Sequence, residues 1–145
     1  MKRLINYQKG ICIIYKMEKE KLNDVVICRG DDTILEVSRI LRDTKQRHLI
    51  VVDNENEPQG IISTVDINNR VVAEEKNINE VKAEGIMTKP IATIEISASY
   101  EDAYQKMIEK GLYSIPVTEN KRLIGLLDFN QLFMKAQEHV KNEKS

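Results

Sequence analysis

Apolar residues recur at helical spacing in two stretches of the chain, and each stretch is followed by short apolar runs of strand length. The helical positions are Ile34, Val37, Ile40 and Leu41 in the first stretch, and Tyr100, Ala103, Tyr104, Met107 and Ile108 in the second. Spacings of three and four residues place such side chains on one face of a helix. Thr33 with Glu36, and Ser99 with Asp102, fit the capping-box pattern and predict where the helices begin.

Each predicted helix is followed by two apolar runs separated by a polar turn. Leu49–Val52 is continuous and apolar, as are Ile61-Ile62 and Leu126-Leu127 with their neighbours. Because these runs do not alternate, they predict strands that are buried on both faces. The turns Asn54–Gln59 and Glu119–Arg122 are short enough for hairpins.

Further elements flank each of these patterns. β-branched residues predict extended segments at Val25–Cys28 and Ile91–Glu95, before the two first helices. Helices are predicted after the second strands, near residues 64–75 and 129–141.

The chain therefore contains an internal repeat. Residues 33–67 and 99–132 match in pattern when one residue is dropped from the turn before the second glycine. The repeat predicts an α/β (α+β) fold of two tandem β-α-β-β-α units. Since each unit is too small to bury its own sheet, we expect the two to pack with pseudo-twofold symmetry.

We expect five segments along the chain: an N-terminal extension (1–16), a first unit (17–75), a linker (76–85), a second unit (86–140) and a tail (141–145). The extension carries four basic residues and no acid, and its apolar stretch is shorter than a signal peptide requires. It is therefore either an extension preceding a start at Met17 or a short strand added to a sheet edge.

The composition of the chain argues against several classes of function. The chain has 145 residues, 41% apolar and 31% charged, with a net charge of −1. A balanced charge argues against generic nucleic-acid binding, and no apolar run approaches the length of a membrane span, so we expect neither nucleic-acid nor membrane contact. Because no signal peptide is recognised, we expect a cytoplasmic protein. Two cysteines and two histidines do not make a closed zinc site without carboxylates, so no metal is expected.

Three short motifs in these repeats resemble those of CBS domains, which occur in pairs as Bateman modules. The motifs are Ile86-Met87-Thr88-Lys89-Pro90-Ile91, Ser114-Ile115-Pro116-Val117 and Gly60-Ile61-Ile62-Ser63-Thr64-Val65-Asp66-Ile67. The resemblance covers about residues 20–138. It implies a regulatory module that binds AMP, ADP, ATP, S-adenosylmethionine or NAD in clefts between the copies, with no cofactor required. No partner domain is recognised, so we expect a stand-alone module acting on an unidentified protein partner.

The resemblance also implies a first ligand site. In the family an Asp three residues after Ser or Thr holds the ribose hydroxyls, and Ser63 and Asp66 match this pattern. Thr64 would lie near the phosphate, and Lys89 or Arg70 could reach it. The residues carried over to this site are Ile61, Ser63, Thr64, Asp66, Met87, Lys89, Pro90, Ile91, Ala92, Leu112, Tyr113 and Ser114. Without a ligand, Ser63 and Asp66 are also an ordinary helix start.

The symmetry-related second site departs from the family pattern. Asp128 replaces the Ser or Thr, and Gln131 replaces the Asp. The residues carried over to this site are Asp24, Val25, Val26, Arg47, His48, Asp128 and Gln131. We expect it to be weak, empty or adapted to another ligand. Asp128 and Gln131 also fit the pattern of a plain helix cap. Arg47 is alternatively a solvated residue at an edge, or the partner of Asp128 in an empty cleft.

Nothing in the sequence predicts catalysis. No nucleophile–base set, phosphate loop or dinucleotide glycine motif occurs, so we expect no enzyme activity. The resemblance implies a homodimer formed through the helices near 66–75 and 129–141. The apolar residues expected on these faces are Ile67, Val71, Val72, Leu132, Phe133 and Val140. The alternative functions are a protein-interaction scaffold with vestigial clefts, and a nucleic-acid regulator using residues 1–16.

Overall fold

A computed structural model describes residues 16–144 of the chain, which divide into two compact units. One, here the first unit, comprises Val25–Ile91 with Lys121–Leu123, and the second unit comprises residues 16–24, 92–120 and 124–144. The predicted extension, apart from Lys16, lies outside the described residues.

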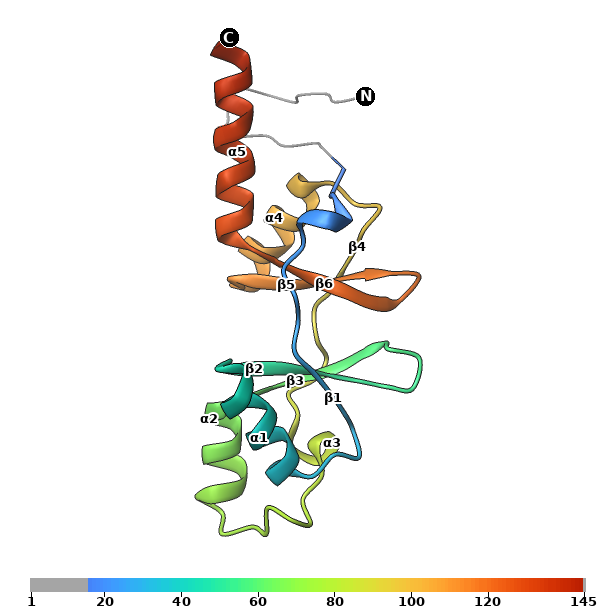
Figure 1. Cartoon of the computed structure of the whole chain (residues 1–145), viewed down its shortest axis with the longest axis vertical. Coiled ribbons are helices and arrows are strands. Elements are labelled where there is room, and N and C mark those ends of the chain that lie inside the picture. Colours follow the sequence, from blue (N-terminus) through green and yellow to red (C-terminus); the bar gives the residue numbers. More distant parts are fainter. Residues whose placement is uncertain (1–15, 145) are drawn as a thin grey trace. The chain divides into compact units, whose positions relative to one another are not determined.

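The first unit is built on a three-stranded sheet with the order β1-β2-β3. β1 (Ile27–Arg29) runs parallel to β2 (His48–Val52), and β2 runs antiparallel to β3 (Pro58–Ser63). The helices α1 (Ile34–Thr44) and α2 (Thr64–Ile67) lie on one face of this sheet (Figure 1). A π-helical turn, η3 (Asn68–Val72), continues α2, and α3 (Ala83–Ile86) follows.

The second unit repeats this plan. Its sheet has the order β4-β5-β6, formed by β4 (Ile94–Glu95), β5 (Ser114–Glu119) and β6 (Arg122–Asp128). The helices are α4 (Tyr100–Lys110) and α5 (Phe129–Lys144), and a short 3₁₀ turn, η2 (Lys19–Lys21), precedes them in the chain. The predicted mixed α/β fold of two tandem β-α-β-β-α units is confirmed.

Local sequence signals determine where the helices begin. The Thr33 and Ser99 side chains accept hydrogen bonds from the Glu36 and Asp102 backbone, and both acids bond back to the cap, as the capping-box pattern predicted. Both helices end at a residue in the left-handed conformation, Lys45 in α1 and Gly111 in α4. Left-handed residues at this position satisfy the last carbonyls of a helix.

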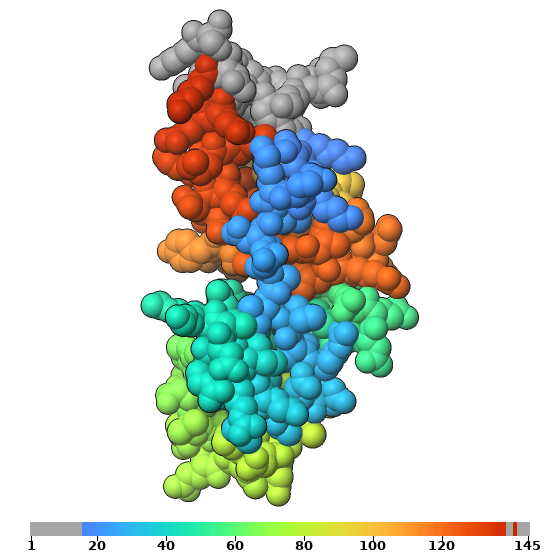
Figure 2. Space-filling view, viewed as in Figure 1, coloured from blue at the N-terminus to red at the C-terminus, as the bar shows by residue number. Residues whose placement is uncertain are grey.

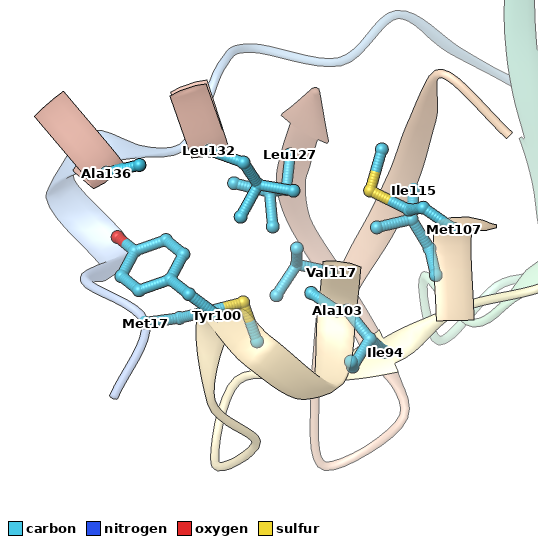
Figure 3. Close-up of a cluster of buried hydrophobic side chains, with 10 residues drawn as sticks. All are labelled: Met17, Ile94, Tyr100, Ala103, Met107, Ile115, Val117, Leu127, Leu132 and Ala136. Atoms are coloured by element: carbon cyan, nitrogen blue, oxygen red, sulfur yellow. The ribbon is translucent and has the colours of Figure 1, made fainter. Parts of the chain in front are cut away.

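Each unit has its own apolar core. In the second unit the core is formed by Met17, Ile94, Tyr100, Ala103, Met107, Ile115, Val117, Leu127, Leu132 and Ala136 (Figure 3). The first core is formed by Cys28, Ile34, Val37, Leu41, Leu49, Val51, Ile62, Val71, Ala83 and Ile86. Burial raises the pKa of the Cys28 thiol to about 12, with a further contribution from Asp32.

Four sequence predictions were wrong in detail. β2 is buried along most of its length, as expected, but β3 and β6 alternate between buried and half-buried positions. The predicted turn Asn54–Gln59 is shorter, because Pro58 and Gln59 belong to β3. The helix predicted over 64–75 is α-helical only to Ile67. Val71 and Leu132, predicted on exposed helix faces, are core residues, and the side chain of Val140 lies outside the described ones.

The segment that precedes each repeat packs on the unit formed by the other repeat. Residues 16–24 precede the first repeat but pack on the second unit, where Asn23 pairs with Leu126 of β6. In Figure 2 this segment, in blue, lies against β6 and α5. Likewise Thr88, which precedes the second repeat, pairs with Ile61 of β3. Each sheet is therefore bordered by the segment that leads into the other repeat.

Candidate functional site

The loop between β3 and α2 holds the Ser63–Asp66 pair. Ser63 is extended and caps α2, and its hydroxyl oxygen accepts from the Asp66 backbone N–H at 3.1 Å. The Asp66 Oδ2 accepts from the Ser63 backbone N–H at 2.8 Å and from the Ser63 hydroxyl at 3.0 Å. The pair is therefore a helix cap whose carboxylate is held in one orientation.

Arg70 contacts the same carboxylate from the π-helical turn. Its Nη2 lies 3.6 Å from Asp66 Oδ1, and its Nη1 donates to the Ile86 carbonyl oxygen at 2.6 Å. The Asp66 side chain remains 18% exposed. Arg70, which the sequence analysis names as a cation that could reach a phosphate, links the Asp66 carboxylate to the last residue of α3, just before the segment that follows this helix.

That segment runs along β3. The Ile61 N–H donates to the Thr88 carbonyl oxygen at 3.0 Å, and the Thr88 N–H donates to Ile61 at 2.8 Å. A side chain at Gly60 would approach Met87 Sδ to 2.8 Å, so the glycine permits this close approach. The exposed Lys89 and Pro90 follow, joined by a cis peptide bond, and Ile91 is half-buried. Within the first unit, Met87 and Thr88 thus lie beside β3, which contains Ile61 and leads directly into the Ser63–Asp66 loop.

The equivalent loop of the second unit has its polar atoms occupied. Asp128 Oδ1 accepts from the Gln131 N–H at 2.8 Å, and Gln131 Oε1 accepts from the Asp128 N–H at 2.9 Å. Asn23 Nδ2 donates to Asp128 Oδ2 at 2.9 Å, and Gln131 Nε2 donates to the Lys21 carbonyl oxygen. These bonds make Asp128 and Gln131 a helix cap that is tied to the segment before the first repeat.

The other residues carried over to the two sites are divided between the units. Ala92, Leu112, Tyr113 and Ser114 of the first site belong to the second unit, as do Asp24, Asp128 and Gln131 of the second site. Val25, Val26, Arg47 and His48 belong to the first unit. The assembly of both sets into two clefts stays a prediction.

Within the first unit, two residues predicted for the second site border the Ser63–Asp66 loop. The Arg47 carbonyl oxygen accepts from the Thr64 N–H at 2.9 Å, and His48 is paired with Ser63 in the β2–β3 register. In the second unit the Tyr113 carbonyl accepts from the Phe129 N–H at 3.0 Å in the same way. The beginning of each second strand therefore lies beside the cap of its own last helix.

Sequence reasoning missed the partners that hold these loops. Thr88 and Asn23 supply the backbone pairs along β3 and β6, and the Lys21 carbonyl holds Gln131. Thr88 lies within the motif that runs from Ile86 to Ile91, but it pairs with Ile61 of a strand that is distant in the sequence. Asn23 and Lys21 lie in a polar segment without a recognisable pattern.

Among residues 16–144, no three His, Cys, Asp or Glu side chains come together as a metal site. Within the same range, none of the helices combines the length and apolar character that crossing a membrane requires.

Two copies of a β-α-β-β-α unit, each with a capped loop after its last strand, define a tandem-repeat α/β module. The CBS domain model matches this sequence twice, at residues 17–73 and 81–136. The chain belongs to the CBS domain family and carries a pair of CBS domains, which are regulatory modules.

Curated relatives extend this similarity. A protein of Methanopyrus kandleri is 30% identical over 110 residues, which is 75% of this chain and 56% of that protein. YlbB of Bacillus subtilis is 30% identical over 115 residues, 79% of this chain and 77% of that protein. A homoserine O-acetyltransferase of Methanococcus vannielii is 31% identical over 122 residues, but the match covers only 25% of that enzyme. The chain spans 56% or less of the Methanopyrus and Methanocaldococcus relatives it matches.

Solved structures show the same fold. Hypoxic Response Protein I, solved with two coordinated zinc ions, has a TM-score of 0.70 at 18% identity and covers 80% of this chain and 95% of its own. A putative signal-transduction protein of Burkholderia ambifaria has a TM-score of 0.61 at 22% identity, covering 82% and 86%. A hexameric CBS-CP12 protein from bloom-forming cyanobacteria has a TM-score of 0.62 at 25% identity, covering 81% and 69%.

Proposed function

We propose that this CBS pair is a metabolite sensor, which binds an adenosine-containing ligand through the Ser63–Asp66 loop and works as a homodimer. The ligand class is AMP, ADP or ATP, or else S-adenosylmethionine or NAD. An unidentified protein partner would respond to the bound state.

The proposal rests on the Asp66 carboxylate, which is oriented by its neighbours and is still partly exposed to solvent. Both its oxygens have partners, yet the side chain keeps 18% of its surface exposed at the end of β3. A carboxylate accepts strongly from the paired hydroxyls of a ribose. Because Ser63 and Arg70 already orient the group, a ribose meets an acceptor whose orientation needs no further ordering.

The second loop supports binding at one site per chain. Gln131 stands where the first loop has Asp66, and its amide accepts from ribose hydroxyls less strongly than a carboxylate does. A carboxylate in the position of Ser63 also repels a phosphate. We therefore assign the adenosine ligand to the Asp66 loop.

Signalling would follow from differential affinity. A ligand shifts a two-state equilibrium only when it binds one arrangement better than the other. The Arg70 guanidinium joins Asp66 to the Ile86 carbonyl, so ribose binding at Asp66 would change the contacts of the segment that leads into the second repeat. The hexameric cyanobacterial CBS-CP12 protein supports assembly between copies as a property of related chains.

The test is thermal unfolding of the full chain with AMP, ADP, ATP, NAD and S-adenosylmethionine, with GTP as the base control. A ligand present at a hundred times its Kd stabilises the folded state by about 2.7 kcal/mol. That corresponds to a rise in Tm of about 5–10 °C for a chain of this size. We expect the rise with one adenosine ligand and its loss in Asp66→Asn.

A matched control separates ligand contact from helix capping. Asp102 has the same capping role on α4 and is assigned no ligand contact, so Asp102→Asn should lower stability yet keep the ligand-induced rise. If no adenosine compound raises Tm at millimolar concentration, or if Asp66→Asn responds like the wild type, the proposal is wrong. The first outcome would favour a scaffold with vestigial clefts.

A further inference from the structure

The first unit contains a hollow at the opposite end of β3 from the Ser63–Asp66 loop. It has a volume of about 310 Å³ and lies where the parallel strands β1 and β2 end, at Arg29 and Val52. All the residues that line it belong to the first unit. Open α/β sheets commonly bind ligands at the carboxyl ends of parallel strands. Ligand pockets have volumes of about 300–1,000 Å³, so this hollow suits a small molecule.

Arg29 brings a fixed positive charge to the hollow. Its Nη1 donates to the Asp53 carbonyl oxygen at 2.6 Å and to Asn56 Oδ1 at 3.0 Å, so the turn between β2 and β3 holds the half-buried side chain. A guanidinium carries further N–H donors in a fixed fork. Among residues 16–144, the Arg29 Nε and Nη2 have no hydrogen-bond partner, so they can donate to a carboxylate.

Two carboxylates line the same hollow, Asp31 after β1 and Glu84 in α3. Both residues are exposed, and within the described range neither side chain has a hydrogen-bond or ion-pair partner. The Glu84 backbone N–H donates to the Gly30 carbonyl oxygen at 2.9 Å, which fixes α3 against the end of β1. A Cβ at Gly30 would lie 2.9 Å from Glu84 Oε2, so the glycine leaves room for this carboxylate.

The second unit pairs the charges at the equivalent place. The register of the parallel strands makes Glu95 the counterpart of Arg29. The backbone pairings four residues further along the chain make Lys19 the counterpart of Glu84. The Lys19 Nζ lies 2.7 Å from Glu119, and the Glu95 carboxylate accepts from two groups in β5 and the turn after it. The fold can therefore neutralise this place internally, and the first unit does not.

We propose that this hollow binds a small zwitterion of the α-amino acid class, with its carboxylate on Arg29 and its ammonium group on Asp31 and Glu84. The two carboxylates repel a ligand that has only a negative charge, and the guanidinium repels one that has only a positive charge. A zwitterion complements both kinds of group, and the Arg29 fork matches a carboxylate. The inference does not rest on the adenosine ligand, because Arg29, Asp31 and Glu84 are not part of the Ser63–Asp66 loop.

The experiment begins with thermal unfolding of the full chain with each protein amino acid in turn at millimolar concentration. The amino acid that raises Tm most is then titrated by calorimetry, beside its amide and its N-acetyl derivative. The amide lacks the carboxylate and the N-acetyl derivative lacks the ammonium group. We expect each derivative to bind with a Kd at least about 10-fold higher, because each loses a charge-assisted hydrogen bond.

A charge variant and a matched control locate the binding. Asp31→Asn with Glu84→Gln removes both carboxylates of the hollow and should raise the Kd of the amino acid about 10-fold or more. Glu74→Gln with Glu80→Gln removes the same charge from exposed residues of the first unit outside the hollow, so it should bind like the wild type. Circular dichroism checks that both variants fold, and Glu84→Gln alone replaces the charge variant if that variant is unfolded.

Three outcomes would overturn the proposal. In the first, no amino acid raises Tm. In the second, the charge variant binds the amino acid as tightly as the control does, which would place the ligand elsewhere on the chain. In the third, one of the two derivatives binds as tightly as the amino acid, which would make the hollow a site for a simple anion or a simple cation.

Discussion

Arg70 is the residue through which the candidate site and the fold are most directly joined. Its guanidinium contacts the Asp66 carboxylate and donates to the Ile86 carbonyl at 2.6 Å. In the second unit the equivalent residue is Lys135, which instead contacts Glu18 at 3.1 Å and lies over the Tyr100 ring at 5.8 Å. The same helix position therefore anchors a different preceding segment in each unit.

Replacing Arg70 by methionine should destabilise the first unit. The change keeps most of the apolar stem but leaves the Ile86 carbonyl without its charged donor, at a cost of about 1 kcal/mol for a partly exposed bond. Urea unfolding measures this loss. Arg42→Met is the control. Arg42 forms an ion pair with Asp43 on the exposed surface, so this change should affect stability little. Equal effects of the two changes would contradict the role given to Arg70.

At the scale of elements, the close packing of β3 against residues 87–88 requires a glycine at position 60. A Cβ at Gly60 would lie 2.8 Å from Met87 Cγ and Sδ and 2.9 Å from the Thr88 carbonyl oxygen. The methionine can move, but the backbone oxygen is held by the pairing of Thr88 with Ile61.

Gly60→Ala should therefore lower the free energy of unfolding by about 1–3 kcal/mol, because the added methyl group forces β3 and residues 87–88 apart. Gly85 in α3 has no atom within 4 Å of an added Cβ, so Gly85→Ala should be neutral or stabilising by about 0.5–1 kcal/mol. Chemical denaturation of both variants measures the difference. If Gly60→Ala is as stable as Gly85→Ala, the close approach is not needed.

An ionic cluster of Glu18, Lys135 and Glu138 joins the residue before η2 to α5. The Lys135 side chain is only 8% exposed and lies 3.1 Å from Glu18 and 3.4 Å from Glu138. The hydrogen bond and charge of Lys135 hold the pKa of Glu18 below its ordinary value of 4.5. Desolvation lowers the pKa of Lys135, but Glu18 and Glu138 outweigh it and raise that pKa above 10.5.

The stability of the second unit should follow these pKa directions. A carboxyl with a lowered folded pKa stabilises fully above its unfolded value and loses that contribution as pH falls through the folded value. The stability difference between wild type and Glu18→Gln should thus be present at neutral pH and shrink below about pH 4.5. Since Glu18 is 38% exposed, the difference should be small. Urea unfolding across pH measures it, with the exposed Glu20→Gln as control; a difference that grows in acid would contradict the assignment.

At the scale of the whole molecule, the chain stabilises each unit with residues that precede the other repeat. Met17 is 4% exposed in the second core, and Ile86 is 4% exposed in the first. Neither residue packs with the repeat that follows it.

Hydrogen exchange should show that each unit is stabilised by the segment preceding the other repeat. Met17→Ala should cost about 2–4 kcal/mol and lower amide protection in β5 and β6, although residue 17 precedes the first repeat. Ile86→Ala should lower protection in β2 and β3 instead. Mass spectrometry of both variants distinguishes the two units. Loss of protection in β2 and β3 of the Met17 variant, with β5 and β6 unchanged, would show that residues 16–24 belong with the first unit.

What the sequence by itself determined is local. The capping boxes at Thr33 and Ser99, the helices they begin and the strands around Leu49 and Ile115 follow from spacing within a few residues. The cap formed by Ser63 and Asp66 was predicted for the same reason. The duplication of the unit follows because this local pattern occurs twice in the chain. Such signals need no knowledge of distant chain segments.

What only the tertiary structure decided depends on residues far apart in the chain. It placed residues 16–24 on the second unit and gave Arg70 and Gln131 their carbonyl partners. It also showed β3 and β6 to be buried on alternate positions, and Val71 and Leu132 to be core residues. Apolar spacing shows that a face is covered but not by which segment, because burial is a sum over neighbours that the sequence does not order.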